Sequence, residues 1–160
     1  MERWYLACHK AGKDNVFKAQ IALGRRNIMA FSPTIRSYRP RSDRPGQFRQ
    51  VMEQLFPGYL FVFFDPEIDH TSEIELCPGI SQLVRFAGEI TPIRDSVVDE
   101  IMQLPVCTQA FTTKHPGKHS WRNNTKPLNN QQRRQIQSLV EENNGLTRSA
   151  MFYAFAESLR

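Results

Sequence analysis

The sequence has no long apolar run and few cysteines. None of its stretches approaches the roughly 20 consecutive apolar residues that a membrane-spanning helix needs. The opening MERWYLACHK places charge on both sides of a short apolar stretch and lacks a small-residue cleavage site, so we expect no secretory signal. Cys8, Cys77 and Cys107 lie outside any Cys-x-x-Cys pair, which argues against a disulfide framework or a zinc site. We therefore expect a cytoplasmic protein with reduced thiols, no membrane contact and no metal.

The usual signatures of catalysis are also missing. No Gly-x-x-x-x-Gly-Lys loop, Gly-x-Gly-x-x-Gly fingerprint or Gly-x-Ser-x-Gly elbow occurs. His115 and His119 are four residues apart, but Pro116-Gly117 between them breaks a helix. Cys77 with His70 is a conceivable nucleophile and base, although a cysteine before Pro-Gly is more often structural. We therefore do not expect the protein to be an enzyme or to bind a cofactor. A cysteine-dependent enzyme is the weakest of the three functional hypotheses developed from the sequence.

Acidic residues are scarce in the first third of the chain. Through residue 50, eleven lysines and arginines stand against only three acidic residues, Glu2, Asp14 and Asp43, whereas the whole chain carries a net charge of +5. Such asymmetry favours a surface for a polyanion, most often nucleic acid. The alternative is a solvated basic surface with no partner.

Residues 1–104 combine strand-like and helix-like apolar patterns. The predicted elements are a strand in 3–10, a helix in 13–27, a strand in 28–40, a basic turn in 41–49, a strand in 58–64, a short helix in 72–79, a strand and turn in 80–93, and a helix in 94–104 capped by Asp95 or Ser96. This order is that of a ferredoxin-like α+β sandwich, in which helices flank an antiparallel sheet. We therefore expect one domain over residues 1–104.

The stretch LFPGYLFVFF is unusually rich in aromatic residues. Alternation along a strand puts Tyr59, Phe61 and Phe63 on one face, and Leu60, Val62 and Phe64 on the other. Only one face needs to belong to a core under the helices, so the other is a candidate docking site. The alternative is that the C-terminal tail buries the second face. Both interpretations hold if the tail covers this face of the strand and can also leave it.

The last part of the chain changes composition twice. Residues 105–126, rich in Thr, Lys, His, Asn and Pro, are predicted to form a linker, with Trp121 packing onto something. Residues 127–160 show helical spacing and predict an amphipathic hairpin. Gly145 is expected to end its first helix, and Thr147 or Ser149 to begin a second in which Met151, Phe152, Phe155 and Leu159 share a face. So short a segment must pack on the first domain or on a partner.

Four segments together resemble a known family: WYLACHKAGKDNVFKAQIAL, LFPGYLFV, FDPEIDHTSEI and PGISQLVRFAG. They resemble the N-terminal (NGN) domain of the NusG family of transcription elongation factors, and most of all its specialised RfaH-like members of the ActX type. The resemblance covers residues 2–104. It implies a domain that rides on bacterial RNA polymerase and suppresses pausing and termination.

The resemblance also implies two contacts with polymerase. An aromatic and aliphatic pocket holds the clamp helices of the largest polymerase subunit, and its matching positions are Tyr5, Leu6, Tyr59, Phe61, Phe86, Val98 and Ile101. A His-Thr-Thr motif, which contacts the polymerase gate loop, is matched by His70-Thr71-Ser72, where serine keeps the hydroxyl. An alternative interpretation of this triplet is a routine helix cap.

The non-template DNA strand is a further partner that the resemblance implies. Family members of this type bind it with a basic patch, matched here by Lys10, Lys13, Arg25 and Arg26. Phosphate contacts set affinity, whereas base contacts set sequence preference. Ala22 replaces a histidine and Cys77-Pro78 replaces a Thr-Arg pair of the RfaH-like pattern. We therefore expect DNA binding with a different sequence preference.

For the tail, the resemblance implies autoinhibition. RfaH-like members place a C-terminal helical hairpin over the clamp-helix pocket and hold it with a Glu–Arg pair, which Glu53 and Arg148 match. Phe152 and Phe155 would supply buried apolar area. Other members end in a KOW barrel, through which the ribosome is recruited. Helical spacing with Gly145 as the only glycine of the hairpin argues against a barrel, so the ribosome is the less favoured partner.

A second hypothesis uses the basic half of the chain without polymerase. In it the protein is a nucleic-acid-binding accessory factor of a mobile element. Loss of polymerase binding with DNA affinity intact, after mutation of Phe61 or Phe86, would separate the first hypothesis from this one.

Overall fold

The computed structural model describes residues 1–104, 107–108 and 126–160. At its centre is an antiparallel sheet in the order β2-β5-β1-β6. Its strands are β1 (Arg3–His9), β2 (Met29–Phe31), β5 (Tyr59–Phe64) and β6 (Ile80–Leu83). Helices α1 (Asn15–Arg25), α2 (Thr71–Glu75) and α3 (Asp95–Met102) flank it, and β7 (Arg85–Phe86) pairs with β8 (Glu89–Ile90). The predicted ferredoxin-like α+β fold is confirmed.

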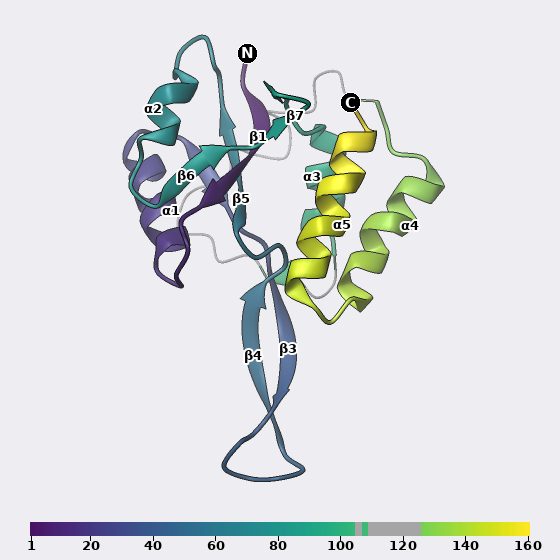
Figure 1. Ribbon diagram of the computed structural model, residues 1–160. Coiled ribbons are helices and arrows are strands. Elements are labelled where there is room, and N and C mark those ends of the chain that lie inside the picture. The colour runs from purple at the N-terminus through teal and green to yellow at the C-terminus, as the bar shows by residue number, and fades with distance from the viewer. Residues whose placement is uncertain (105–106, 109–125) are drawn as a thin grey trace.

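Alternation along the strands divides the interior into two cores, one on each face of the sheet. Trp4 and Leu6 of β1 belong to one core, and Tyr5 and Ala7 belong to the other. Helices α1 and α2 cover the second core, whereas α3 and the C-terminal helices cover the first (Figure 1). Among the described residues, no helix is long and apolar enough to cross a membrane.

The predicted C-terminal helical hairpin is present as α4 (Asn130–Ser138), the 3-10 turn η1 (Leu139–Glu141) and α5 (Gly145–Ser158). Asn129 and Gln132 form a reciprocal capping box at the start of α4. The Asn144 side chain accepts a hydrogen bond from the Thr147 amide, so α5 begins at Gly145. The expectation that Gly145 ends the first helix is therefore wrong, because the preceding asparagine is a cap for the next helix.

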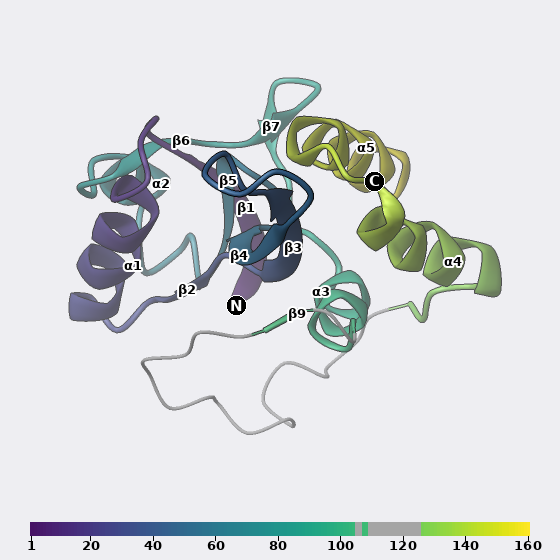
Figure 2. The ribbon, with the colours of Figure 1, turned by 90° about the horizontal axis from the view of Figure 1, so that it is seen from below.

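A two-stranded ribbon of β3 (Thr34–Pro40) and β4 (Phe48–Gln54) extends away from the sheet and helices (Figure 1) and points toward the viewer in Figure 2. It corrects the prediction twice. The single strand expected in 28–40 is broken at Ser32-Pro33 into β2 and β3, which lie in different sheets. Part of the expected turn in 41–49, together with the residues after it, forms β4, whose exposed side chains carry little apolar signal.

Two further predictions concerned the start of α3 and the segment 105–126. Residue Arg94 occupies the N-cap position of α3, without a side-chain capping bond, so neither Asp95 nor Ser96 is the cap. The expected linker in 105–126 lies outside the described residues except for β9 (Cys107–Thr108), which pairs with the base of β3, and residue 126. His115, His119 and Trp121 also lie outside the described part of the chain.

Candidate functional site

Most of the residues expected to contact the clamp helices gather on one face of the sheet. Its apolar cluster includes Leu6 from β1, Phe61 from β5, Phe86 from β7, and Val98 and Ile101 from α3. Tyr59 is partly buried and packs against the same cluster. These side chains come from four elements that the sheet and α3 bring together. We call the set Leu6, Phe56, Tyr59, Phe61, Phe86, Val98 and Ile101 the docking surface.

Tyr5 does not belong to the docking surface. It lies on the opposite face of the sheet, where its ring packs on Phe64 with centroids 4.6 Å apart. Burial raises the pKa of its hydroxyl there. Tyr5 and Leu6 were expected to lie on the same surface. The structure corrects this expectation, because adjacent side chains of a strand point to opposite faces of the sheet.

Helix α5 covers the docking surface. The Phe152 ring stacks on Phe56 at a centroid distance of 4.3 Å and meets the Phe61 ring edge-on at 5.6 Å. Tyr153 packs on Phe86 at 5.0 Å, and Phe155 is buried in the same cluster.

The expected apolar face of this helix is only partly correct. Phe152, Phe155 and Ala156 are buried, but Met151 keeps 39% of its surface exposed. Leu159 packs against the cluster from the C-terminal end of α5 while remaining half-buried.

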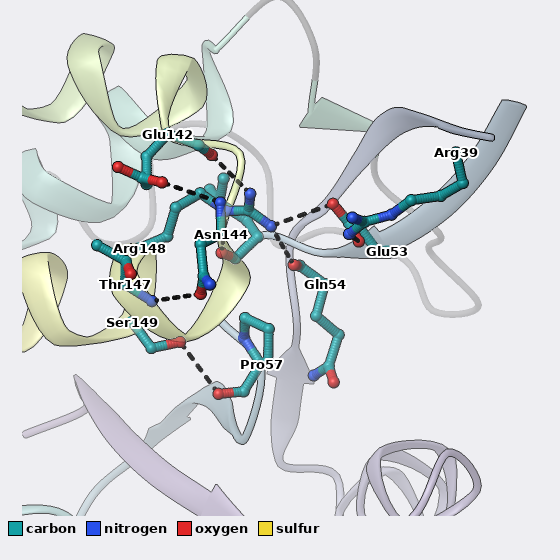
Figure 3. Close-up of polar contacts among 10 residues, drawn as sticks. Arg39, Glu53, Gln54, Pro57, Glu142, Asn144, Thr147, Arg148 and Ser149 are labelled. Atoms are coloured by element: carbon teal, nitrogen blue, oxygen red, sulfur yellow. Dashed lines mark hydrogen bonds and ion pairs between the residues drawn. The ribbon is translucent and has the colours of Figure 1, made fainter. Parts of the chain in front are cut away.

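Arg148 of α5 is fully buried at the junction with the first domain (Figure 3). Its Nε donates to the Leu55 carbonyl at 2.8 Å, and its Nη1 donates to the Glu142 carbonyl at 2.8 Å. Its Nη2 donates to the Gln54 carbonyl at 3.2 Å and to Glu53 Oε1 at 3.4 Å. The expected Glu–Arg pair therefore exists, but the shorter bonds of this guanidinium go to backbone carbonyls.

Glu53 is shared between two arginines. Its Oε2 accepts a 2.6 Å hydrogen bond from Arg39 of β3, while Oε1 faces Arg148. Burial alone would raise the pKa of this carboxyl, but the hydrogen bond and charge of Arg39, with the charge of Arg148, outweigh it and lower the pKa. Glu53 is thus held ionised by two arginines, of which Arg39 is the closer partner, although the sequence analysis paired Glu53 with Arg148 alone.

Further polar contacts between side chains and backbone surround this apolar junction. The Ser149 hydroxyl donates to the Pro57 carbonyl at 3.0 Å. Arg94 Nη2 donates to the Leu159 carbonyl at 2.7 Å, and Arg160 Nη1 donates to the Phe86 carbonyl at 2.9 Å. These bonds fix the position of α5 along its length, because each of them is directional.

Sequence reasoning missed Phe56 and the carbonyls of residues 54 and 55. Phe56 directly precedes the Pro57-Gly58 turn, and for that reason it was not expected to stack on a helix. Its position beside the aromatic strand was the signal that could have identified it. Carbonyl acceptors leave no trace in the side-chain sequence, so only the fold could reveal them.

The triplet His70-Thr71-Ser72 lies at the start of α2, on the other side of the sheet from α5 (Figure 1). His70 holds the N-cap position but makes no side-chain capping bond. His70 and Ser72 are exposed, and Thr71 is half-buried. The triplet and the docking surface therefore lie on opposite faces of the sheet.

The four expected DNA contacts lie at two ends of one helix. Lys10 and Lys13 precede α1, whereas Arg25 and Arg26 lie at its C-terminal end, about 15 Å away. All four are exposed, and Arg26 is ion-paired with Glu73 of α2.

Beside Arg25 and Arg26 is an open depression of about 330 Å³. Its other lining residues are Ala22, Glu73, Leu76, Cys77 and Pro78. The positions that depart from the RfaH-like pattern are thus brought together around one depression. Cys77 is buried and its thiol donates to the Glu73 carbonyl at 3.5 Å, an arrangement that makes it part of the packing.

Two comparisons with known proteins bear on the family of this chain. A family model described as "Transcription termination factor nusG" matches residues 2–102. Among solved structures, the chain is similar to one described as "Domain interaction in Thermotoga maritima NusG", with 24% identity and a TM-score of 0.35 over 64% of this chain and 56% of that one. The chain thus spans little more than half the length of that protein. Because the family model covers more than half of the sequence, the chain belongs to the NusG family of transcription factors.

Proposed function

We propose that this protein is an RfaH-like transcription elongation and antitermination factor whose α4–α5 hairpin covers its binding site for bacterial RNA polymerase. One observation carries the proposal. Phe152 of α5 packs on Phe56 and Phe61, and it therefore covers aromatic side chains of the surface that would bind the clamp helices. Two helices cannot occupy this surface at once, so docking of α5 and binding of polymerase exclude each other.

The docking surface has the chemistry of a groove for an amphipathic helix. Such grooves bury apolar side chains spaced along one helix face and fix them with a few polar bonds at the edge. The residues Phe152, Phe155 and Ala156 of α5 use that spacing already. A clamp helix of the largest polymerase subunit is the proposed alternative occupant.

The exposed triplet His70-Thr71-Ser72 is proposed to contact the gate loop of the same polymerase. It lies across the sheet from the docking surface, which suits a protein held between two parts of a large enzyme. Its histidine and two hydroxyls can form hydrogen bonds with polar backbone or side-chain groups.

The non-template DNA strand is proposed to follow α1. Lys10 and Lys13 at one end and Arg25 and Arg26 at the other supply exposed cations at the two ends of α1, whose inner face packs on the sheet. The depression lined by Ala22, Cys77 and Pro78 carries smaller or less polar groups than the RfaH-like pattern. We therefore expect phosphate contacts to dominate affinity and base preference to differ from that of RfaH-like relatives.

In this proposal, autoinhibition results from competition between α5 and a clamp helix of polymerase for the docking surface. The affinity for polymerase is reduced by the fraction of molecules in which α5 has left the docking surface. A partner that binds only the open form shifts the population toward it. In this proposal, DNA together with the polymerase supplies the free energy that opens the hairpin.

The test is a titration of immobilised bacterial core polymerase with the full chain and with residues 1–104. Tight binding by the truncation and weak binding by the full chain are expected. Phe86→Ala in the truncation should abolish this binding while leaving DNA affinity intact. Ile74→Ala is the matched control, because this side chain is fully buried but lies in the core on the opposite face.

Other outcomes would correct the proposal. Equal binding by both forms would keep the polymerase partner and remove autoinhibition. Absence of binding by either form, with DNA affinity retained, would favour a nucleic-acid-binding factor that does not use polymerase.

A further inference from the structure

The ribbon of β3 and β4 carries exposed rings on one face. Its register places Tyr38 opposite Gln50 and Pro40 opposite Phe48, so that these side chains point to the same side. Tyr38 is 69% exposed and Phe48 is 64% exposed. On the same face, Arg36 lies opposite Met52, which is 52% exposed. Large rings held open to solvent on a projecting ribbon are typical of an interaction surface.

The same ribbon is strongly basic. Residues 34–54 contain five arginines and only two acidic residues, Asp43 and Glu53. Glu53 pairs with Arg39, and Asp43 pairs with Arg41. Arg36, Arg44 and Arg49 are exposed and form no ion pair with any residue that the structure describes. The charge left over is positive. Arg36 lies on the same face as the two rings and Arg44 lies in the turn between the strands, whereas Arg49, which is opposite Arg39, points to the other face.

We infer that this ribbon binds a single-stranded nucleic acid by stacking bases on Tyr38 and Phe48. Sites for single strands combine cations along the phosphates with aromatic rings that each take a base. Diagonal positions on paired strands lie about 7–8 Å apart, so each ring has room for a base of its own. Arg36 on the same face and Arg44 in the turn neutralise the phosphates, and arginine also stacks on bases.

A single strand fits the ribbon better than the other polyanions. In a duplex the base faces are already stacked inside the helix, so Tyr38 and Phe48 would find only edges and sugars. An acidic peptide would use the arginines but has no flat groups for the rings. DNA and RNA strands share the chemistry that the ribbon recognises, because each base has a stacking face.

This surface differs from the one proposed for the non-template strand. The α1 patch lies on the globular body, from which the ribbon projects (Figure 1). Tyr38 and Phe48 lie in the half of the ribbon away from its base, where Thr34 pairs with Gln54. The inference therefore adds a second nucleic-acid contact that does not require polymerase or opening of α5.

The test uses the full chain and fluorescence anisotropy with labelled strands of about 12 thymidines or uridines, and with a duplex of the same length. The double variant Tyr38→Leu/Phe48→Leu keeps apolar bulk but removes both rings. It should lose about tenfold or more in affinity for the single strand. The control Tyr38→Phe/Phe48→Tyr keeps both rings and should bind like the wild type.

A second measurement locates the contact. A strand that carries 5-bromouracil is irradiated with the protein, and the cross-linked peptides are identified by mass spectrometry. Cross-links at Tyr38 or Phe48 are expected, and they should persist in a Lys10→Ala/Arg26→Ala background. Binding of either the DNA or the RNA strand with this ring dependence supports the inference.

Three results would overturn it. They are equal affinity of the leucine variant and the wild type, duplex binding as tight as single-strand binding, and cross-links confined to residues 10–26. Because no polymerase is present in these assays, their failure and the failure of the polymerase proposal are separate outcomes.

Discussion

The two faces of the central sheet are both apolar and both covered by helices, but the two covers differ in kind. Helices α1 and α2 belong to the ferredoxin-like unit and pack on Leu60, Val62 and Phe64 from nearby in the chain. Helix α5 comes from the far end of the sequence and meets Phe61 and its neighbours.

Both covers also form polar bonds with the sheet or with segments beside it. On the α2 side, the Leu83 amide of β6 donates to Glu75 Oε1 at 2.9 Å. On the α5 face, the arginine side chains of residues 94, 148 and 160 donate to backbone carbonyls across the junction. Water can replace such bonds when the surfaces separate, so their net contribution to stability is small compared with their effect on orientation. The two covers therefore differ most in their place in the chain, because α1 and α2 lie within the ferredoxin-like unit and α5 follows it.

The largest expected effect comes from removing the ring at the centre of the α5 junction. Phe152→Ala should weaken docking of the hairpin by about 3–5 kcal/mol, because it leaves a cavity between Phe56 and Phe61. Amide hydrogen exchange should then show faster exchange throughout α4 and α5. Met151→Ala is the matched control, since this neighbour is 39% exposed and should change stability by about 0.5 kcal/mol or less. Unchanged exchange in the Phe152 variant would mean that α5 is not held by this contact.

The next effect tests the polar part of the junction. Arg148→Met keeps a long side chain but removes the donors to the carbonyls of Leu55, Gln54 and Glu142. Docking should weaken by about 2–3 kcal/mol, because the buried acceptors lose their partners. The same hydrogen-exchange measurement on Arg133→Met, an exposed arginine of α4, provides the reference. If the two variants behaved alike, the guanidinium would contribute nothing to holding the cover.

A pair of glycines contrasts the two covers directly. A Cβ at Gly145 would lie 2.7 Å from Cγ of the Pro57 ring, whereas a Cβ at Gly24 in α1 would meet no atom within 4 Å. Gly24→Ala should therefore stabilise the protein by about 0.5–1 kcal/mol through helix propensity. Gly145→Ala should destabilise docking by about 1 kcal/mol, because the rigid ring or the helix must move. Thermal unfolding of both variants checks the opposite signs, and a gain at both positions would contradict the close approach of α5 to Pro57.

The smallest effect concerns Asp95 at the start of α3. Burial and the nearby charge of Asp99 raise the pKa of this carboxyl to about 6, against the opposing charge of Arg3. A carboxyl that holds its proton more tightly in the folded state makes stability fall as pH rises from about 4 to 6. Because Asp95 is half exposed, the penalty at pH 7 is about 1 kcal/mol or less.

The variant Asp95→Asn should therefore raise the melting temperature at pH 7, and the gain should shrink as pH falls through about 6. Asp14→Asn is a suitable control, since Asp14 is exposed at the N-cap position of α1 and its side chain makes no capping bond that the substitution would remove. A gain that did not depend on pH would assign the effect to something other than this titration.

The sequence predicted the elements that repeat a clear apolar period. β1, α1, β5 and α3 follow from alternation or helical spacing, and their order was enough for the ferredoxin-like fold. β4 was missed because its side chains are exposed or half-buried and carry no regular pattern. The division of residues 28–40 into two strands depended on Pro33, which turns the chain from the sheet into the ribbon.

The site was only partly predictable for a related reason. The aromatic positions of β5 and the arginine of α5 are visible as residue types. Their partners are not, because the ring of Phe56, the carbonyl of Leu55 and the second arginine on Glu53 are brought together only by tertiary packing. The error at Tyr5 had a simpler origin, since the strand period alone separates it from Leu6.

The central claim is that α5 and polymerase compete for one surface, and linkage between the two tests it most directly. We would measure, for Phe152→Ala and Arg148→Met in the full chain, both the loss of docking free energy and the affinity for bacterial core polymerase. The account predicts that each 1.4 kcal/mol of lost docking raises the affinity by about tenfold until the hairpin is fully open. Variants that loosen the hairpin but leave the affinity for polymerase unchanged would contradict it.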